Sequence, residues 1–333
     1  MKSFKFLIIV LTMISCAHRN ISAQPNESDK TFFTKPRFGV IVHFLYQLQN
    51  ENPEWNDGKK TSWDSCVNDF NVQKFANQLA EIKADYVIFT IHQKTQYMCI
   101  PNEAFEKITG LKRGEATSNI DLIAKLSREL QKRNIKLFLY IPGDGPYGNT
   151  FLRDKFTYGF TPGGTLKINQ NYLEKWTSVI KEISLRYKDK VTGWWVDGCD
   201  PSKGFNNAVF KQLEDAMKAG NPKALVAFNY AYDKSPYMDS SIGDYSAGEE
   251  YNLKYFPSKD SVVPQNKYWH ISSFVGKSWT SSGIRFTDNY LSKYMSTCLR
   301  SGSVTLGVAI NRNGEIQRDQ LGQLVRTAAS RKR

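Results

Sequence analysis

The chain has 333 residues, of which 13% are aromatic, and a formal net charge of +13 at pH 7. This length fits one large α/β barrel as well as two domains, and the aromatic content argues against a disordered chain. The lysines are scattered along the sequence instead of clustering on one element, so a nucleic-acid partner is not expected, whereas an anionic glycan stays open.

The N-terminus has the pattern of an export signal: two lysines precede an apolar stretch that is too short to span a bilayer. Met13-Ile14-Ser15-Cys16 resembles a bacterial lipoprotein box. We therefore expect residues 1–15 to be a signal peptide, Cys16 to be lipidated and residues 16–34 to form a tether. Cleavage after residues 21–23 is the alternative and would release a soluble protein. The predicted location is the periplasm or cell surface of a bacterium, with the membrane reached only through the lipid anchor.

Apolar runs of strand length alternate with helical patterns along the rest of the chain. The unbroken run Tyr86-Val87-Ile88-Phe89 suits a strand buried on both faces of a parallel sheet, and apolar stripes of helical spacing mark the helices. The predicted strands are residues 38–46, 85–92, 136–141, 191–197, 225–230, 242–245, 268–274 and 304–310. The predicted helices are residues 72–83, 120–134, 171–187, 206–218, 288–300 and 318–329.

This alternation predicts a parallel sheet with right-handed crossovers. We predict a closed (β/α)8 TIM-like barrel that forms a single domain over residues 35–333. A doubly wound open sheet is the alternative, but no Gly-rich phosphate turn follows the first strand. The sequence has no CxxC pair and no helical spacing of histidines, so neither a metal nor another cofactor is expected. The four cysteines after Cys16 allow three disulfide pairings in an exported protein.

Polar side chains close nearly every predicted strand, at the end where a barrel carries its function. The most informative strand ends on a carboxylate, Asp197, directly after Trp194 and Trp195. This pattern suits sugar cleavage, because an aromatic ring can stack on the sugar while a carboxylate meets the anomeric carbon. In the plain alternative, Asp197 only caps the next turn. The other strand-end candidates are His43, His92, Gln93, Tyr97, Tyr140, Asp144, Asn229, Glu249, Glu250, His270 and Trp279.

Several motifs resemble those of the α-L-fucosidases of glycoside hydrolase family 29. Phe38-Gly39-Val40-Ile41-Val42-His43 resembles the opening strand of that family, and Glu54-Trp55 resembles a motif in the loop that follows. Val196-Asp197-Gly198 resembles the nucleophile strand. Trp279 resembles the Trp of a Ser-Trp-Gly loop, and residues 306–320 resemble the last strand, turn and helix. The order and spacing of these motifs carry the resemblance over most of the chain.

The resemblance implies an exo-acting, retaining glycoside hydrolase that uses two carboxylates on an oligosaccharide or polysaccharide. Asp197 would attack the anomeric carbon. Glu249, where the family often has Thr-Pro-Glu, would be the acid and base, with Glu250 and Glu54 in reserve. The two carboxyl groups would lie about 5–5.5 Å apart. The residues expected to bind the substrate are His43, Trp55, His92, Gln93, Tyr97, Tyr140, Trp195, Asn229 and Trp279.

Departures from the family pattern concern sugar recognition. The family has Lys-His-His-Asp-Gly-Phe after its second strand, whereas this chain has Ile91-His92-Gln93-Lys94-Thr95-Gln96-Tyr97, with one histidine. The sequence also stops at the final barrel helix, so the family's usual C-terminal β-sandwich is expected to be absent. Two alternatives follow: a retaining glycosidase for another deoxy or methylated sugar, and a non-catalytic glycan-binding lipoprotein on the same barrel. The sequence does not indicate an oligomeric state.

Overall fold

The computed structural model describes residues 29–229, 242–257 and 268–330. Seven strands form one sheet in the order β7-β6-β3-β2-β1-β9-β8, and every pairing in it is parallel. These strands are β1 (Phe38–Val42), β2 (Tyr86–Thr90), β3 (Lys136–Pro142), β6 (Gly193–Asp197), β7 (Leu225–Phe228), β8 (His270–Phe274) and β9 (Ser303–Gly307). A separate antiparallel hairpin pairs β4 (Gly159–Phe160) with β5 (Leu166–Lys167).

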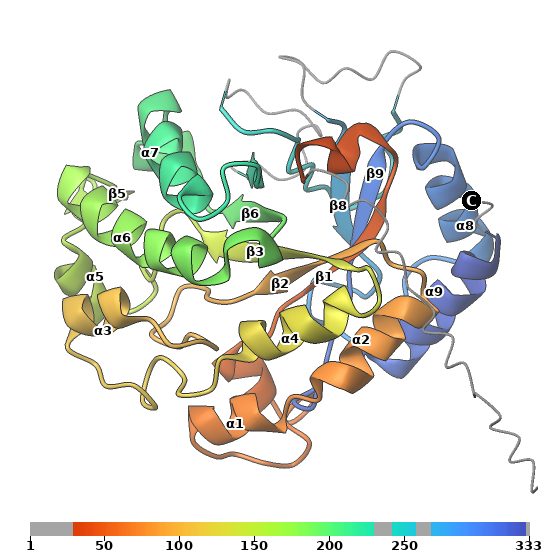
Figure 1. Cartoon of the computed structure of the whole chain (residues 1–333), viewed down its shortest axis with the longest axis horizontal. Helices are drawn as coiled ribbons and strands as arrows, with labels where there is room; N and C mark the ends of the chain where they lie inside the picture. Colours follow the sequence, from red (N-terminus) through yellow and green to blue (C-terminus); the bar gives the residue numbers. More distant parts are fainter. Residues whose placement is uncertain (1–28, 230–241, 258–267, 331–333) are drawn as a thin grey trace, which may run out of the picture.

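Helices cover the outer face of the curled sheet, with α3, α6 and α7 toward one end of it and α8 and α9 toward the other (Figure 1). The α-helices are α1 (Trp63–Asp69), α2 (Val72–Glu81), α3 (Glu103–Thr109), α4 (Leu122–Gln131), α5 (Thr150–Phe156), α6 (Gln170–Tyr187), α7 (Asn207–Lys218), α8 (Asp288–Cys298) and α9 (Arg318–Ser330). The short helices are η1 (Asp29–Thr34), η2 (Gln47–Glu51), η3 (Lys188–Lys190) and η4 (Pro201–Lys203). The six predicted helices are confirmed. None of the described helices is both long and apolar enough to cross a membrane.

The prediction of a strand at residues 242–245 is wrong, although this part of the chain forms backbone hydrogen bonds with β7 and β8. The Asp244 N–H donates to the carbonyl of Val226 in β7 (2.7 Å), and the Glu250 N–H donates to the carbonyl of Ser272 in β8 (2.9 Å). Gly243, inside the predicted range, and Gly248, beyond it, both have positive φ (+99° and +65°), and Tyr245 pairs with Tyr268 only through an isolated bridge, so no regular strand forms. The described sheet therefore has seven strands instead of the predicted eight, in an arrangement consistent with a TIM-like barrel.

Aromatic rings fill the enclosed interior near the N-terminal ends of the strands. The rings of Tyr86 and Phe138 lie 5.2 Å apart between centroids, and Tyr245 packs on Phe138 at 6.1 Å. Gly39 and Gly193 face these rings: a Cβ would lie 2.5 Å from Tyr86 at the first position and 2.4 Å from Phe138 at the second. Large and small inward residues thus complement each other across neighbouring strands, as in the packed core of a barrel.

The helix η1 closes this end of the interior. Phe32 and Phe33 are 3% and 5% exposed. The Phe33 ring lies 4.8 Å from that of Tyr245 and 5.5 Å from that of Phe138. Residues 29–34 therefore belong to the folded domain, which corrects the C-terminal limit of the predicted tether (16–34). The predicted signal peptide, Cys16 and the remainder of the tether lie outside the described residues.

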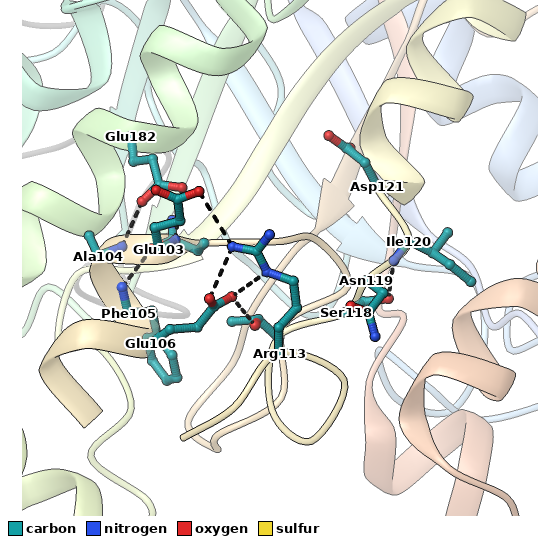
Figure 2. Close-up of polar contacts among 12 residues, drawn as sticks. Glu103, Ala104, Phe105, Glu106, Arg113, Ser118, Asn119, Ile120, Asp121 and Glu182 are labelled. Carbon is teal, nitrogen blue, oxygen red and sulfur yellow. Dashed lines mark hydrogen bonds and ion pairs between the residues drawn. The ribbon is translucent and has the colours of Figure 1, made fainter. Parts of the chain in front are cut away.

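A polar network holds the long segment between β2 and α4 (Figure 2). The Glu182 carboxylate on α6 accepts hydrogen bonds from the backbone N–H groups of Glu103 (2.9 Å) and Ala104 (2.7 Å) in the first turn of α3. The Arg113 guanidinium donates two hydrogen bonds of 3.0 Å to Glu106. Bidentate pairs of this kind fix geometry as well as charge. Two residues near the start of this segment, Gln93 and Lys94, line a cavity at the C-terminal ends of the strands.

The cysteines in the described part of the chain are buried free thiols, so no disulfide crosslinks that part of the chain. They are Cys66, Cys99, Cys199 and Cys298.

Phe33→Ala tests whether η1 is part of the core. The substitution leaves a cavity over the Tyr245 and Phe138 rings, so we expect the free energy of unfolding to fall by about 3–5 kcal/mol. Denaturant unfolding measures this change. Phe151→Ala is the matched control, because Phe151 is 45% exposed and its truncation should cost far less. Equal losses in the two variants would contradict a core role for η1.

Candidate active site

A cavity of about 370 Å³ opens at the C-terminal ends of the strands. In a parallel sheet these ends share one edge, so residues far apart in sequence meet there. The lining comes from the ends of the strands and from the loops that follow them. The lining residues are Ile41, His43, Gln93, Lys94, Tyr140, Pro142, Asp144, Tyr147, Trp195, Asp197, Gly198, Asp200, Lys203, Asn229, Glu249, Tyr251, Trp279 and Thr280.

Asp197 ends β6, and both of its carboxylate oxygens accept hydrogen bonds. The Tyr140 hydroxyl donates to Oδ2 (2.5 Å), and the Asn229 amide donates to Oδ1 (3.0 Å). Gln93 in turn donates to the Tyr140 hydroxyl (2.8 Å). The Tyr140 ring stacks on Trp195 with 5.4 Å between centroids and 17° between planes. These contacts fix the orientation of the Asp197 carboxylate in the cavity.

Glu249 shares the Asn229 amide with Asp197. The same Nδ2 atom of Asn229 donates to Glu249 Oε2 and to Asp197 Oδ1, so the two carboxyl oxygens are separated by at most about two hydrogen-bond lengths, roughly 6 Å. Trp279 lines the cavity together with Glu249. Burial, and then the nearby charge of Asp197, raise the pKa of Glu249 to about 7. Two carboxyl groups with such different surroundings can act as a proton donor and a nucleophile.

The two reserve carboxylates lie outside the cavity. Successive side chains of an extended segment alternate in direction, so Glu250 points away from the side that Glu249 faces. Glu250 is buried, its Oε2 accepts from the Asn252 N–H (2.7 Å), and burial raises its pKa. Glu54 is exposed in the loop after β1. Of the three predicted acid candidates, Glu249 is therefore the one that lines the cavity.

His43 follows β1 and lines the cavity. Its Nδ1 lies 3.1 Å from the Thr90 hydroxyl, and its ring meets those of Tyr140 and Trp279 edge to face. Burial lowers the pKa of His43 to about 4, against an opposing effect of Asp197. The imidazole is therefore neutral near pH 7 and can exchange hydrogen bonds with a sugar hydroxyl.

His92 does not line the cavity, contrary to the predicted substrate contact. Its side chain is fully buried against Phe105 and Trp176, and its Nε2 lies 2.6 Å from the Thr95 carbonyl oxygen. The chain folds back on itself here through a bridge between His92 and Met98, which directs this side chain into the core. The next residue, Gln93, lines the cavity instead.

Two further predicted contacts lie outside the cavity. Tyr97 stacks on Tyr46 with 3.8 Å between centroids and 11° between planes. Trp55 is buried and borders, together with His43, a small separate hollow. The remaining predicted substrate-binding residues line the cavity. These are His43, Gln93, Tyr140, Trp195, Asn229 and Trp279.

One wall of the cavity carries Asp144, a predicted strand-end candidate, together with residues that the sequence did not single out. Asp144, which follows β3, is 1% exposed, and its Oδ2 accepts from the Lys203 ammonium (2.5 Å). Burial, opposed by Lys203, raises the pKa of Asp144 to about 7. Lys94 and Tyr147 complete this wall. The strand-end position of Asp144 was a usable signal, whereas Lys203 arrives from the short helix η4, which has no periodic pattern.

Across the described ranges, His, Cys, Asp and Glu side chains form no group of three or more that could hold a metal ion.

Residues 15–329 match the family model described as Alpha-L-fucosidase. The chain belongs to the α-L-fucosidase family. It is thus a member of a family of glycoside hydrolases, and the resemblance seen in its motifs is confirmed. Curated proteins give no sequence match.

Solved structures share the fold at low sequence identity. The endo-fucoidan hydrolase MfFcnA9 of glycoside hydrolase family 107 is 15% identical with a TM-score of 0.66, and the match covers 92% of this chain and 64% of that one. An α-L-fucosidase of family 29 from Bacteroides thetaiotaomicron is 16% identical with a TM-score of 0.61, covering 91% and 71%. This chain therefore spans less than two thirds of MfFcnA9.

The raised pKa of Glu249 predicts how the free energy of unfolding changes with pH. The pKa is about 7 in the folded protein and 4.5 ordinarily, so between these values the folded state binds more protons than the unfolded state. The contribution of Glu249 to the free energy of unfolding is then greatest below pH 4.5 and falls by about 3 kcal/mol as the pH rises toward 7. Unfolding free energies measured across this range should fall less steeply in Glu249→Gln than in the wild type.

Glu54→Gln is the control for this measurement, because Glu54 is exposed and outside the cavity. It should leave the slope of the wild type unchanged. Parallel curves for the wild type and Glu249→Gln would show that Glu249 does not carry the shifted pKa.

Proposed function

We propose that this protein is an exo-acting, retaining glycosidase that removes α-L-fucose from glycans, with Asp197 as nucleophile and Glu249 as acid and base. The observation that carries the proposal is the shared Asn229 amide, which sets the two carboxyl groups close together in one cavity. This spacing fits the roughly 5–5.5 Å expected of a retaining enzyme and leaves little room for the water that an inverting enzyme places between its carboxylates.

In the first step Asp197 attacks the anomeric carbon while Glu249 gives its proton to the glycosidic oxygen. The carbon–oxygen bond to the leaving group breaks, the leaving group departs as an alcohol, and the sugar is held as an ester of Asp197. A pKa near 7 keeps Glu249 protonated in part of the resting enzyme around neutral pH. The Tyr140 and Asn229 hydrogen bonds hold the nucleophile in the orientation needed for the attack.

In the second step Glu249, now ionised, takes a proton from a water molecule that attacks the same carbon and releases Asp197. Glu249 changes from acid to base because it lies close to Asp197. Ester formation removes the negative charge of Asp197, which is one of the causes that raise the pKa of Glu249. The pKa of Glu249 therefore falls in the intermediate, where a base is required.

Aromatic and polar side chains around this pair form the proposed sugar-binding site. Trp195 and Tyr140 stack on each other beside Asp197 and present ring surface to the apolar face of a sugar. The neutral imidazole of His43 and the amide of Gln93 can recognise hydroxyl groups. We extend the proposal to export and lipid anchoring through Cys16, which the N-terminal sequence pattern supports.

A retaining glycosidase for another deoxy or methylated sugar is the second candidate. The observation in its favour is the position of His92 in the core and of Gln93 and Lys94 in the cavity, where the family carries paired histidines. This change alters hydroxyl recognition and leaves the two carboxylates in place.

Asp197→Asn should abolish turnover while the fold stays intact. Removal of a nucleophile that acts only in the transition state is expected to lower kcat by at least about a thousandfold. The measurement is hydrolysis of a panel of 4-nitrophenyl glycosides, α-L-fucoside included, by wild type and variant side by side. Tyr268→Phe, two residues before β8 and outside the cavity lining, is the control and should retain activity.

The panel separates the candidates. Asp197-dependent turnover of the fucoside supports the fucosidase, and Asp197-dependent turnover of another sugar supports the second candidate. Full activity of Asp197→Asn would rule out its role as nucleophile. Glycan binding by a folded protein without turnover of any glycoside would favour a binding protein on the same barrel.

Glu249→Gln should remove the alkaline limb of the pH profile. In the wild type kcat/KM should fall above pH 7, because the general acid loses its proton there. The variant should lose about 10²–10⁴-fold on substrates with poor leaving groups and much less on 4-nitrophenyl substrates, whose leaving group needs little protonation. A uniform loss on both substrate types, with the alkaline limb retained, would move the acid role to another residue.

A further inference from the structure

We propose that Lys94 and Lys203, together with Tyr147, form a cationic subsite that binds an oxyanion substituent, a sulfate ester or a carboxylate, on the glycan. The proposal rests on the proposed glycosidase function, because it names the chemistry of the substrate for the same cavity. Lys94 follows β2, Tyr147 follows β3 and Lys203 ends η4, and all three line the cavity with Asp197.

Both ammonium groups lie against one aromatic ring. The Nζ atom of Lys203 is 4.6 Å from the centroid of the Tyr147 ring, and the Nζ atom of Lys94 is 5.5 Å from it. Two positive charges that share a ring repel each other, and an anion bound beside them would offset this repulsion. The Tyr147 ring therefore gathers positive charge on one wall of the cavity.

The backbone of Lys94 is held in a conformation that residues other than glycine rarely adopt. Its φ is +58°, and the Gly148 N–H donates to its carbonyl oxygen (2.9 Å). A Cβ at position 148 would lie 2.6 Å from that oxygen, so this close approach requires glycine. Strained backbone that the surrounding structure enforces is found mainly at functional sites. Here it fixes the point at which the Lys94 side chain enters the cavity.

The carboxylate paired with Lys203 is less accessible than the ammonium group. Asp200, which also lines the cavity, acts on Lys203 only through longer-range attraction. Lys203 is paired with Asp144, but the Asp144 side chain is 2% exposed and the Lys203 side chain 20%, so a ligand meets the ammonium. Lys94 is exposed where it lines the cavity, and its Nζ atom lies beside the Tyr147 ring; Asp197 and Asp144 act on it only through longer-range attraction. An oxyanion would supply the charged partner that Lys94 lacks among the described residues, and a neutral hydroxyl would not.

The test measures binding to Asp197→Asn by isothermal titration calorimetry. The probes are a fucose oligosaccharide that carries sulfate esters and the same oligosaccharide after chemical desulfation. We expect the sulfated form to bind about tenfold more tightly, the scale of a hydrogen bond to a charged group. The preference should disappear in Asp197→Asn/Lys94→Gln and persist in Asp197→Asn/Lys94→Arg, which keeps the charge. Asp197→Asn/Lys277→Gln, which removes an exposed lysine outside the cavity lining, should keep the preference.

The proposal would be overturned if neither the sulfated oligosaccharide nor a uronic-acid oligosaccharide bound more tightly than its neutral counterpart, or if a preference survived Lys94→Gln. A uronic-acid oligosaccharide and its carboxyl-reduced form, measured in the same way, separate a carboxylate ligand from a sulfate ester. Circular dichroism establishes that each variant is folded. Turnover is not read in this experiment, so a wild type without hydrolytic activity would refute the glycosidase function and leave the binding result standing.

Discussion

Alternation of side chains between the two faces of a parallel strand is the constraint on which the rest of this structure depends. One face of the curled sheet is enclosed, and the inward rings of Tyr86, Phe138 and Tyr245 fill it near the N-terminal ends of the strands. Phe33 covers that end from outside the sheet. Because this end is packed, space for a ligand is left at the C-terminal ends, and the cavity lies there.

Alternation also separates the two neighbouring glutamates after β7. Glu249 lines the cavity and Glu250 is buried outside its lining, although the two residues have the same chemistry. The pKa of Glu249 rises because it is buried beside Asp197, and Asn229 holds the two groups at a spacing suited to a double displacement. The Asn229 amide therefore sets the distance between the two carboxyl groups, and with it the effect of the Asp197 charge on Glu249.

Much of the fold was predictable because it depends on local patterns. Apolar runs identified the strands of the seven-stranded sheet, which are four to seven residues long, and apolar stripes of helical spacing identified helices such as α4, whose Leu122, Ile123, Leu126 and Leu130 are buried. The exceptions involve backbone geometry and long-range contacts. Gly243 and Gly248, both with positive φ, interrupt a segment that otherwise follows the sheet, and the two phenylalanines of η1 enter the core from a stretch that reads as a polar tether.

The sequence by itself determined the parallel α/β architecture, the family and the position of Asp197 at the end of a strand, since each follows from residues close together in the chain. Only the tertiary structure decided which side chains share the cavity. It placed Glu249 and Asn229 beside Asp197, brought Lys203 into the same cavity and sent His92 into the core. The physical reason is that side-chain direction at a strand end depends on how the following loop folds, and these loops are fixed by contacts with distant parts of the chain.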